Sequence, residues 1–488
     1  MKVPELGIGL TYHPILDRVL EKHTGLIQVL EIEPQTHWLQ PNLFENTYVI
    51  DEVVLQKLQQ LPFHKLMHGI GFPVGGSRLP DAIEYPLHRT MIEALNVPWM
   101  SEHLNFNKAC CNGREFVTNY MLPPLQTSAG VQAAVQTIKS MQSSVPVPIA
   151  VETGVNYLRT IPGQINDGRF MREVVEKADC GILLDLHNIL TNQINGRQSM
   201  EDFLGEIPLE RVVELHVAGG KMRGNFYIDA HCGPIPDNLF EVAAQLIPTL
   251  PNLGAVIFEI FPDYLEGNGA GFVAKDLEQL NRIWDRRKQK RGELKKRVLP
   301  PAQPVEMTPM STITPAEWED TLAALVTGQQ VDCPWDELND DPAIDLIKDL
   351  IQTFRASMVS ESYRYTARLL MIYLGVEEYE NLLANYWMGS TPEPFASTEG
   401  ANFISYIQRS KIEVVGLQEI IAFEKAYMAT LMDGKERVVN FPFDPLSFMK
   451  ALAEGRKPHQ LYEGNYELVV EARQGIIENT FHHKAVVH

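Results

Sequence analysis

The chain has 488 residues, of which 45% are hydrophobic and 21% charged, as in ordinary globular proteins. Its net charge of −20 argues against a protein that mainly grips nucleic-acid phosphates, because such proteins need a basic surface. No stretch reaches the roughly 18 apolar residues of a membrane span, so we expect neither a nucleic-acid partner nor a membrane partner.

The cysteines favour a reducing compartment. There are five, they form no CxxC pair, and an odd number over this length is no disulfide framework. The first residues, MKVPELGIGLTYHP, lack the charged segment and long apolar run of a signal peptide. We therefore expect a cytoplasmic protein.

Short apolar runs alternate with longer amphipathic segments along the first 260 or so residues. The runs are Leu6–Leu10, Val29–Glu33, Leu66–Phe72, Trp99–Phe106, Pro148–Thr153, Gly181–Asn188, Val212–Gly219 and Ala255–Phe261. The intervals hold helical patterns such as Met91–Asn96 and Val131–Met141. Eight strand–helix units predict an α/β fold, a TIM (β/α)8 barrel over residues 1–285. An open doubly wound sheet is less favoured, because no glycine-rich phosphate loop follows an early strand.

The composition then changes. Arg286–Arg297 is basic and polar, and Pro300–Pro315 is rich in Pro, Ser and Thr. We interpret the basic run as the end of the last barrel helix, since Lys and Arg favour a helix C-terminus, rather than as a nucleic-acid patch. Residues 286–312 are thus predicted to be a linker.

Residues 313–488 predict a mainly helical second domain with a few short strands. Thr314 and Glu317 form a capping-box pattern at the start of its first helix. Further amphipathic helices are expected at Ile344–Phe354, Ser360–Leu374, Glu377–Trp387 and Val414–Leu431, and strands at Val438–Phe441 and Tyr466–Val470.

Polar side chains stand near the ends of six consecutive predicted strands. They are His68, His103, Glu152, Asp185, His187, Asn188, His216, Asp229, His231 and Glu259. The carboxyl ends of the strands are where active sites of TIM barrels lie. Acids and imidazoles inside apolar strands are costly unless they are paired or bind metal. Their convergence therefore predicts a metal site.

The mixture of imidazoles, carboxylates and an amide suits Fe, Mn or Zn rather than a thiolate-bound metal. So many donors would saturate one ion, so two or three ions fit better, with Glu152 as a bridge. Taken singly, each residue has a structural alternative: a lone histidine is more often simply hydrogen-bonded, and Glu31 and Glu33 are interpreted as structural. We interpret Cys232 as a neutral buried thiol.

Eight motifs occur in the order found in one family. They are GIGLTYHP, HGIGFPVGG, SEHLNF, ETGVNYL, LLDLHNILTN, ELHVAGG, DAHCGPIP and FEI. Over about residues 5–265 the chain resembles the multinuclear non-haem iron-dependent oxidases, which include the oxidase of methanobactin biosynthesis. Endonuclease-IV-like and sugar-isomerase-like barrels share the architecture but not this series of motifs.

The resemblance implies two or three iron ions of mixed Fe(II)/Fe(III) valence and dioxygen as a co-substrate. The implied metal ligands are His68, His103, Glu152, Asp185, Asn188, His216, Asp229, His231 and Glu259. The resemblance also implies oxidation of a residue in a ribosomally made precursor peptide, either a cysteine or a C-terminal Asn or Asp.

Three departures from the family pattern lie at the site. The usual Glu-Asn is Glu152-Thr153 here, the usual Asn-Asn is His187-Asn188, and a Glu-Asn near the second strand is Gln35-Thr36. His187 is either an additional ligand or a base behind the ligands, and both remain open. We expect Glu152, Asp185 and His187 to be the catalytic residues.

The helical domain resembles, more weakly, the partner proteins that bind the leader of the precursor peptide. This resemblance rests on MVSESYRYTARLLMIYLGVEEYENLLANYW and VNFPFDPLSFMKAL. Oxidase and partner thus look fused, so that no separate partner protein is needed; a generic packing or dimerisation domain is the alternative. Two other functions stay open for the whole chain: a metal-dependent hydrolase or isomerase, and a non-catalytic peptide-binding scaffold.

Overall fold

A computed structural model describes residues 2–41, 47–111, 113–261, 270–289, 299, 312–458 and 463–471. Eight parallel strands close into a barrel in the order of the sequence. They are β1 (Gly7–Thr11), β2 (Val29–Ile32), β5 (His64–Gly69), β6 (Met100–His103), β9 (Ile149–Glu152), β10 (Gly181–Asp185), β11 (Val212–Val217) and β14 (Ala255–Phe258). The predicted barrel is confirmed, and the open sheet is not.

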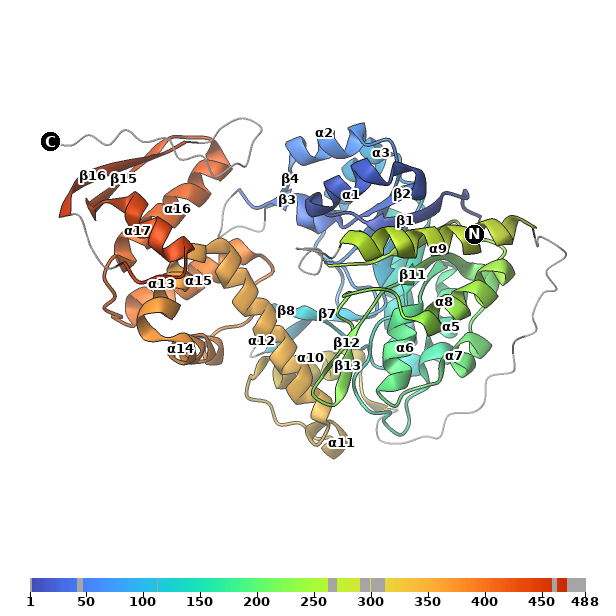
Figure 1. Ribbon diagram of the computed structural model, residues 1–488. Helices are drawn as coiled ribbons and strands as arrows, with labels where there is room; N and C mark the ends of the chain where they lie inside the picture. The colour runs from blue at the N-terminus through green and yellow to red at the C-terminus, as the bar shows by residue number, and fades with distance from the viewer. Residues whose placement is uncertain are drawn as a thin grey trace.

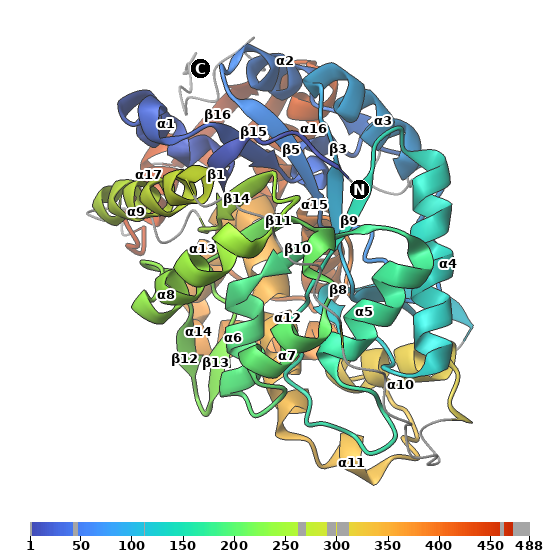
Figure 2. The same ribbon diagram turned by 90° about the vertical axis from the view of Figure 1, so that its right-hand side faces the viewer.

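Helices surround the barrel, as Figure 2 shows. They are α1 (Asp17–Lys22), α2 (Glu52–Gln60), α3 (Glu84–Leu95), α4 (Ser128–Ser144), α5 (Asp167–Ala178), α6 (Leu186–Ile194), α7 (Met200–Glu206), α8 (Asp237–Leu246) and α9 (Ala270–Gln289). Short 3-10 turns lie at Pro14–Leu16, Thr24–Leu26, Pro34–His37, Leu209–Arg211 and Ile247–Thr249. None of the described helices has the length and hydropathy that crossing a bilayer requires.

The strands are apolar on both faces because both faces are covered. Outward side chains such as Ile8, Met67 and Leu184 pack against the surrounding helices in one large cluster. Inward side chains such as Leu66 and Trp99 fill the lower barrel in a second cluster. The polar residues predicted to form the site lie at the opposite, carboxyl end of the strands.

Gly9 lies where two strands approach closely. A Cβ atom there would stand 2.3 Å from the carbonyl oxygen of Val29 on β2. Gly9→Ala is expected to lower the free energy of unfolding by about 1–3 kcal/mol, because the added methyl must push two paired strands apart. Urea unfolding followed by circular dichroism measures this, with Gly25→Ala as control, since a Cβ atom at Gly25 meets nothing within 4 Å. Equal stability of the two variants would contradict the prediction.

Three hairpins extend the carboxyl end of the barrel. Antiparallel pairs follow β2, β6 and β11. They are β3 (Trp38–Leu39) with β4 (Val49–Ile50), β7 (Phe106–Cys111) with β8 (Arg114–Leu122), and β12 (Lys221–Arg223) with β13 (Phe226–Ile228). They raise walls around the mouth of the barrel.

The region after residue 312 is mainly helical and lies behind the barrel in Figure 2. Its elements are α10 (Pro315–Thr327), α11 (Asp336–Asn339), α12 (Pro342–Ser362), α13 (Arg364–Leu374), α14 (Val376–Met388), α15 (Ala396–Arg409), α16 (Leu417–Asp433), β15 (Arg437–Phe443), α17 (Pro445–Ala453) and β16 (Glu463–Val470). The capping box of Thr314 and Glu317 is present, and β15 pairs with β16.

This region has two cores. Helices α10 to α12 share an apolar cluster with the β7–β8 hairpin, including Trp318, Ile347 and Phe106. The chain from Val359 to Val470 encloses a cluster of its own. In Figure 1, α10 and α12 accordingly lie between the barrel and the remaining helices.

The helical prediction was wrong in its details. The expected helix Ser360–Leu374 is interrupted at Tyr363, whose φ of −126° and ψ of 58° are not helical. Helices α11, α15 and α17 were not predicted. Most of the predicted linker, residues 290–298 and 300–311, lies outside the described residues.

Candidate metal centre

The register of the barrel brings the predicted polar residues to one level. His103 is paired with Glu152 between β6 and β9, and Asp185 with His216 between β10 and β11. Glu259 directly follows β14, and its backbone N–H donates to the carbonyl of Val217. Parallel strands that end together therefore present these side chains side by side.

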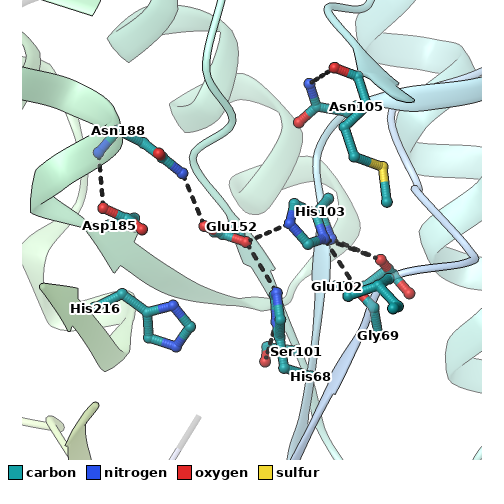
Figure 3. A network of polar contacts seen from close by, with 12 residues as sticks. His68, Gly69, Ser101, Glu102, His103, Asn105, Glu152, Asp185, Asn188 and His216 are labelled. Atoms are coloured by element: carbon teal, nitrogen blue, oxygen red, sulfur yellow. Dashed lines mark hydrogen bonds and ion pairs between the residues drawn. The ribbon is translucent and has the colours of Figure 1, made fainter. Parts of the chain in front are cut away.

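Glu152 stands at the centre of one half of the site, as Figure 3 shows. Its Oε2 lies 3.2 Å from His68 Nε2 and 3.1 Å from His103 Nε2. Its Oε1 accepts a hydrogen bond of 3.0 Å from the side-chain amide of Asn188. One carboxylate thus faces two imidazoles from two neighbouring strands.

The other half of the site gathers around Glu259. Its Oε1 lies 3.2 Å from His216 Nδ1, and its Oε2 lies 3.2 Å from His231 Nε2. Asp229 Oδ1 lies 2.8 Å from His231 Nε2 and 3.3 Å from His187 Nε2. Asp185 joins the two halves, because its carboxylate lies within 4.8 Å of donor atoms of Glu152 and His216. The structure therefore brings all ten predicted residues together, and their roles as ligands remain a prediction.

Four groups of three residues have donor atoms within 4.8 Å of one another. They are His68, His103 and Glu152; Glu31, His216 and Glu259; Glu152, Asp185 and His216; and Asp185, His231 and Glu259. Because Glu152, Asp185, His216 and Glu259 each belong to two groups, the arrangement suits adjacent ions that share ligands.

Several buried nitrogen and oxygen atoms face this network without a well-formed hydrogen bond among the described residues, and some of them stand only at ion-pair distance from a neighbouring imidazole or carboxylate. They are Oε2 of Glu152, Oδ2 of Asp185, Oδ1 of Asn188, Nδ1 of His216, Oδ1 of Asp229, Nε2 of His231 and Oε2 of Glu259. Buried polar atoms without well-formed hydrogen bonds are rare in folded proteins and costly. A cluster of buried nitrogens and oxygens that face one another in this way is what a cation site presents, so these residues fit a group of metal ions.

The atoms turned away from the network are held by the protein. His103 Nδ1 lies 3.0 Å from the carbonyl oxygen of Gly69, and His68 Nδ1 lies 3.0 Å from Ser101 Oγ. These contacts leave Nε2 of both imidazoles facing Glu152. Asp185 caps helix α6, since its Oδ1 accepts from Asn188 N at 2.7 Å, which leaves its Oδ2 directed to the site.

The charged side chains of the site shift one another's pKa values. Burial alone would lower the pKa of His68, but its close contact with the Glu152 carboxylate and the charge of that residue raise this pKa to about 10. Burial and the neighbouring charges of Glu259 and Glu152 raise the pKa of Asp185 well above its ordinary value. A bound cation would favour the ionised form of such a crowded carboxylate.

A cavity of about 1100 Å³ opens directly above these residues. Its floor includes His68, His103, Glu152, Asn188, Asp229, His231 and Glu259. Its walls come from β8, from one face of α12 through Leu350, Phe354, Met358 and Glu361, and from residues 391–396. The helical region therefore forms one side of the space through which a substrate reaches the floor.

Two residues of the site, Glu31 and Glu33, were interpreted from the sequence as structural, but Glu33 lines the cavity. Glu31 has its Oε2 3.0 Å from His216 Nε2, and it belongs to one of the groups of donors. An acid inside an apolar strand was the available signal, but the strand alone did not show that it faces inward. Cys232, predicted to be a buried neutral thiol, is only partly buried, and this burial raises the pKa of its thiol.

Comparison with known proteins adds a family match over the barrel. The sequence model of the "RiPP precursor modification enzyme MbnB/TglH/ChrH" family matches residues 5–263. Two relatives, each named UPF0276 protein, match part of the chain. One from Streptomyces avermitilis is 28% identical over 43% of this chain and 45% of its own length. One from Vibrio vulnificus is 26% identical over 50% of this chain and 80% of its own length. This chain thus spans less than half of the Streptomyces protein.

Solved structures show a more distant likeness. D-psicose 3-epimerase from Clostridium cellulolyticum is 14% identical with a TM-score of 0.33, over 59% of this chain and 97% of its own. Endonuclease IV from Thermus thermophilus is 13% identical with a TM-score of 0.35, and the match covers 59% of this chain and 100% of that protein. At these values the likeness carries no inference about metal or substrate.

Proposed function

The chain belongs to the family of RiPP precursor modification enzymes described as MbnB/TglH/ChrH, which act on ribosomally made peptides, and from this premise we propose an iron-dependent oxidase. It uses two or three bound iron ions and dioxygen to oxidise a residue of a precursor peptide. That residue is a cysteine or a C-terminal Asn or Asp. The observation that carries the proposal is the convergence of buried nitrogen and oxygen atoms, several without a well-formed hydrogen bond, beneath one large cavity.

The proposed ligands divide between two ends of the site. His68, His103 and Glu152 hold one end, and His216, Asp229, His231 and Glu259 hold the other, with Asp185 and Asn188 between them. When bound, iron supplies the redox chemistry with dioxygen that these side chains lack. Imidazole and carboxylate donors without thiolates suit that metal.

The neighbouring residues of the protein hold the proposed ligands in position. Gly69 and Ser101 fix the orientation of the two imidazoles that face Glu152, and the amide of Asn188 holds Glu152 itself. His187 is fully buried, and its Nε2 lies 3.3 Å from Asp229. We assign His187 the role of a proton-holding group beside Asp229, with Asp185 and Glu152 as the other catalytic residues.

The cavity suits a peptide better than a small metabolite. Its volume of about 1100 Å³ exceeds the range of roughly 300–1,000 Å³ typical of small-molecule pockets. Apolar side chains of Phe116, Phe354, Met358 and Phe395 share its walls with polar groups. Such a mixed surface accommodates the backbone and side chains of a short extended segment.

The helical region, residues 313–488, is proposed to bind the leader of the precursor and to take the place of a separate partner protein. Its second core, from Val359 to Val470, makes a body outside the barrel that offers a surface of its own. Leader binding there raises the effective concentration of the peptide's remaining part at the cavity.

The test is turnover of a precursor peptide encoded beside the gene. Protein loaded with iron is expected to consume dioxygen when the peptide is added, and mass spectrometry of the peptide should show a change that requires air. Protein loaded with zinc serves as control and should leave the peptide intact. Turnover without dioxygen, or by the zinc-loaded protein, would replace the oxidase by a hydrolase or isomerase.

A further inference from the structure

The β12–β13 hairpin stands between helix α12 and two of the proposed ligands. Residues 221–228 form the hairpin, and the chain continues directly into Asp229 and His231. In Figure 1, the hairpin lies beside α10 and α12, on the side of the barrel that faces the helical region. It therefore touches both the helical region and one end of the site.

The helical region holds the outer part of the hairpin. Arg223 Nη2 lies 2.5 Å from Asp349 Oδ2 and donates a hydrogen bond of 3.0 Å to Thr353 Oγ1, both on α12. Ile228 and Ala230 belong to the same apolar cluster as Ile347 and Ile351 of α12. A charged contact and an apolar contact thus join the two parts.

The barrel holds the inner part. The side chain of Asn195, which follows α6, makes two hydrogen bonds to the backbone of Tyr227, at 2.8 and 3.0 Å. Tyr157 Oη accepts a hydrogen bond of 3.0 Å from the backbone N–H of Asp229. These contacts fix where the hairpin ends and the ligand-bearing loop begins.

The loop needs such support because its backbone is strained. His231 has a φ of 41°, a left-handed conformation that residues other than glycine seldom adopt. Strain of this kind persists only when surrounding contacts impose it. If the hairpin were released, the loop would relax and His231 would turn away from Glu259.

We propose that the hairpin couples the seating of α12 to metal binding at the Asp229–His231 end of the site, with Arg223, Asn195 and Tyr157 as positioning residues. The helical region is then a structural part of the metal centre as well as a peptide-binding body. This inference rests on the proposed function, since it requires that the site bind iron.

The test uses Arg223→Glu in the full chain, which sets two carboxylates against each other at Asp349. The variant is expected to lose iron from one end of the site to a chelator about fivefold faster, while the end built by His68, His103 and Glu152 keeps its iron. Mössbauer spectroscopy of protein loaded with iron-57 distinguishes the ends. The exchanged pair, Arg223→Glu with Asp349→Arg, should restore the slow release.

Two further variants make the result decisive. Tyr157→Phe leaves the N–H of Asp229 without its acceptor and should speed release from the same end by about 10-fold. Thr398→Val is the matched control, because it removes a hydrogen bond of 2.8 Å between the helical region and Gln40, away from the hairpin. Wild-type release in both Arg223→Glu and Tyr157→Phe, or equal loss from both ends, would overturn the coupling. Wild-type protein without an iron cluster would instead overturn the proposed function.

Discussion

Glu152→Gln is expected to abolish the multinuclear centre, lowering metal affinity by more than about 100-fold and oxygen-dependent turnover with it. Glu152 is 2% exposed, and its Oε2 faces the Nε2 atoms of His68 and His103. Gln keeps the shape but removes the charge and one of the two acceptor oxygens. The remaining imidazoles and carboxylates then lack the group that joins them. Iron per chain, measured by elemental analysis after passage through a weak chelator, checks this.

Glu214→Gln is the matched control for Glu152→Gln. Glu214 is also completely buried in the barrel, but its Oε2 accepts a hydrogen bond of 3.0 Å from Trp99 Nε1 and it belongs to none of the groups of donor atoms. Burial and the charge of Glu31 raise the pKa of Glu214 to about 8, which favours its neutral carboxyl form, and an amide has nearly the same shape. This variant should keep its iron. Full iron content in Glu152→Gln would show that Glu152 is not a ligand.

Arg355→Met is expected to lower the free energy of unfolding of the helical region by about 3–5 kcal/mol. Arg355 on α12 is 1% exposed, and its Nε donates a 2.8 Å bond to Glu399 Oε1 on α15. Its Nη2 donates to Ser390 Oγ and to the carbonyl of Thr391. Without it, the carboxylate of Glu399 is buried with no cation, and the segment after Ser390 loses its anchor.

Chemical unfolding followed by tryptophan fluorescence measures the loss caused by Arg355→Met. Arg282→Met is the control, because Arg282 pairs with Glu278 at 3.2 Å on an exposed face of α9. An exposed pair of this kind contributes less than about 1 kcal/mol. A similar loss of unfolding free energy in the two variants would mean that the Arg355–Glu399 pair does not stabilise the helical region more than an exposed pair does. Residues 391–396 line the cavity, so peptide binding should also weaken in Arg355→Met.

The barrel and the proposed ligands were predictable because each leaves a local signal. Short apolar runs between amphipathic segments mark buried parallel strands, and a polar residue at the end of such a run is conspicuous. His68, His103 and Glu152 were found in this way, and the register brings them together. Glu31 was missed as a member because a single strand does not show which of its side chains faces His216.

Helix α15 was not predicted because the first half of its sequence, ASTEGANFISYIQR, contains Ser, Thr, Gly and Asn, which have low helix propensity. Gly400 among them has a tertiary role. A Cβ atom there would stand 2.1 Å from Ser362 Oγ and 2.6 Å from the ring of Tyr363, so glycine allows α15 to pack closely on α12. Contacts between distant segments thus decide a helix that local propensity does not favour.

The docking of the helical region on the barrel was likewise beyond sequence reasoning. Ser77 and Arg78 bind Glu319 across more than 240 residues, and Trp318 Nε1 donates to the carbonyl of Pro123. No periodicity within either segment predicts such pairs. They place one face of α12 over the mouth of the barrel, whereas the sequence predicted only a second domain joined to the barrel by a linker.

The most direct measurement is the metal content of protein made in iron-supplemented cells and purified without air, combined with Mössbauer spectroscopy. We predict two or more iron ions per chain, with both ferrous and ferric components. Zinc or manganese at full occupancy, or a single iron ion per chain, would contradict the proposed multinuclear iron centre.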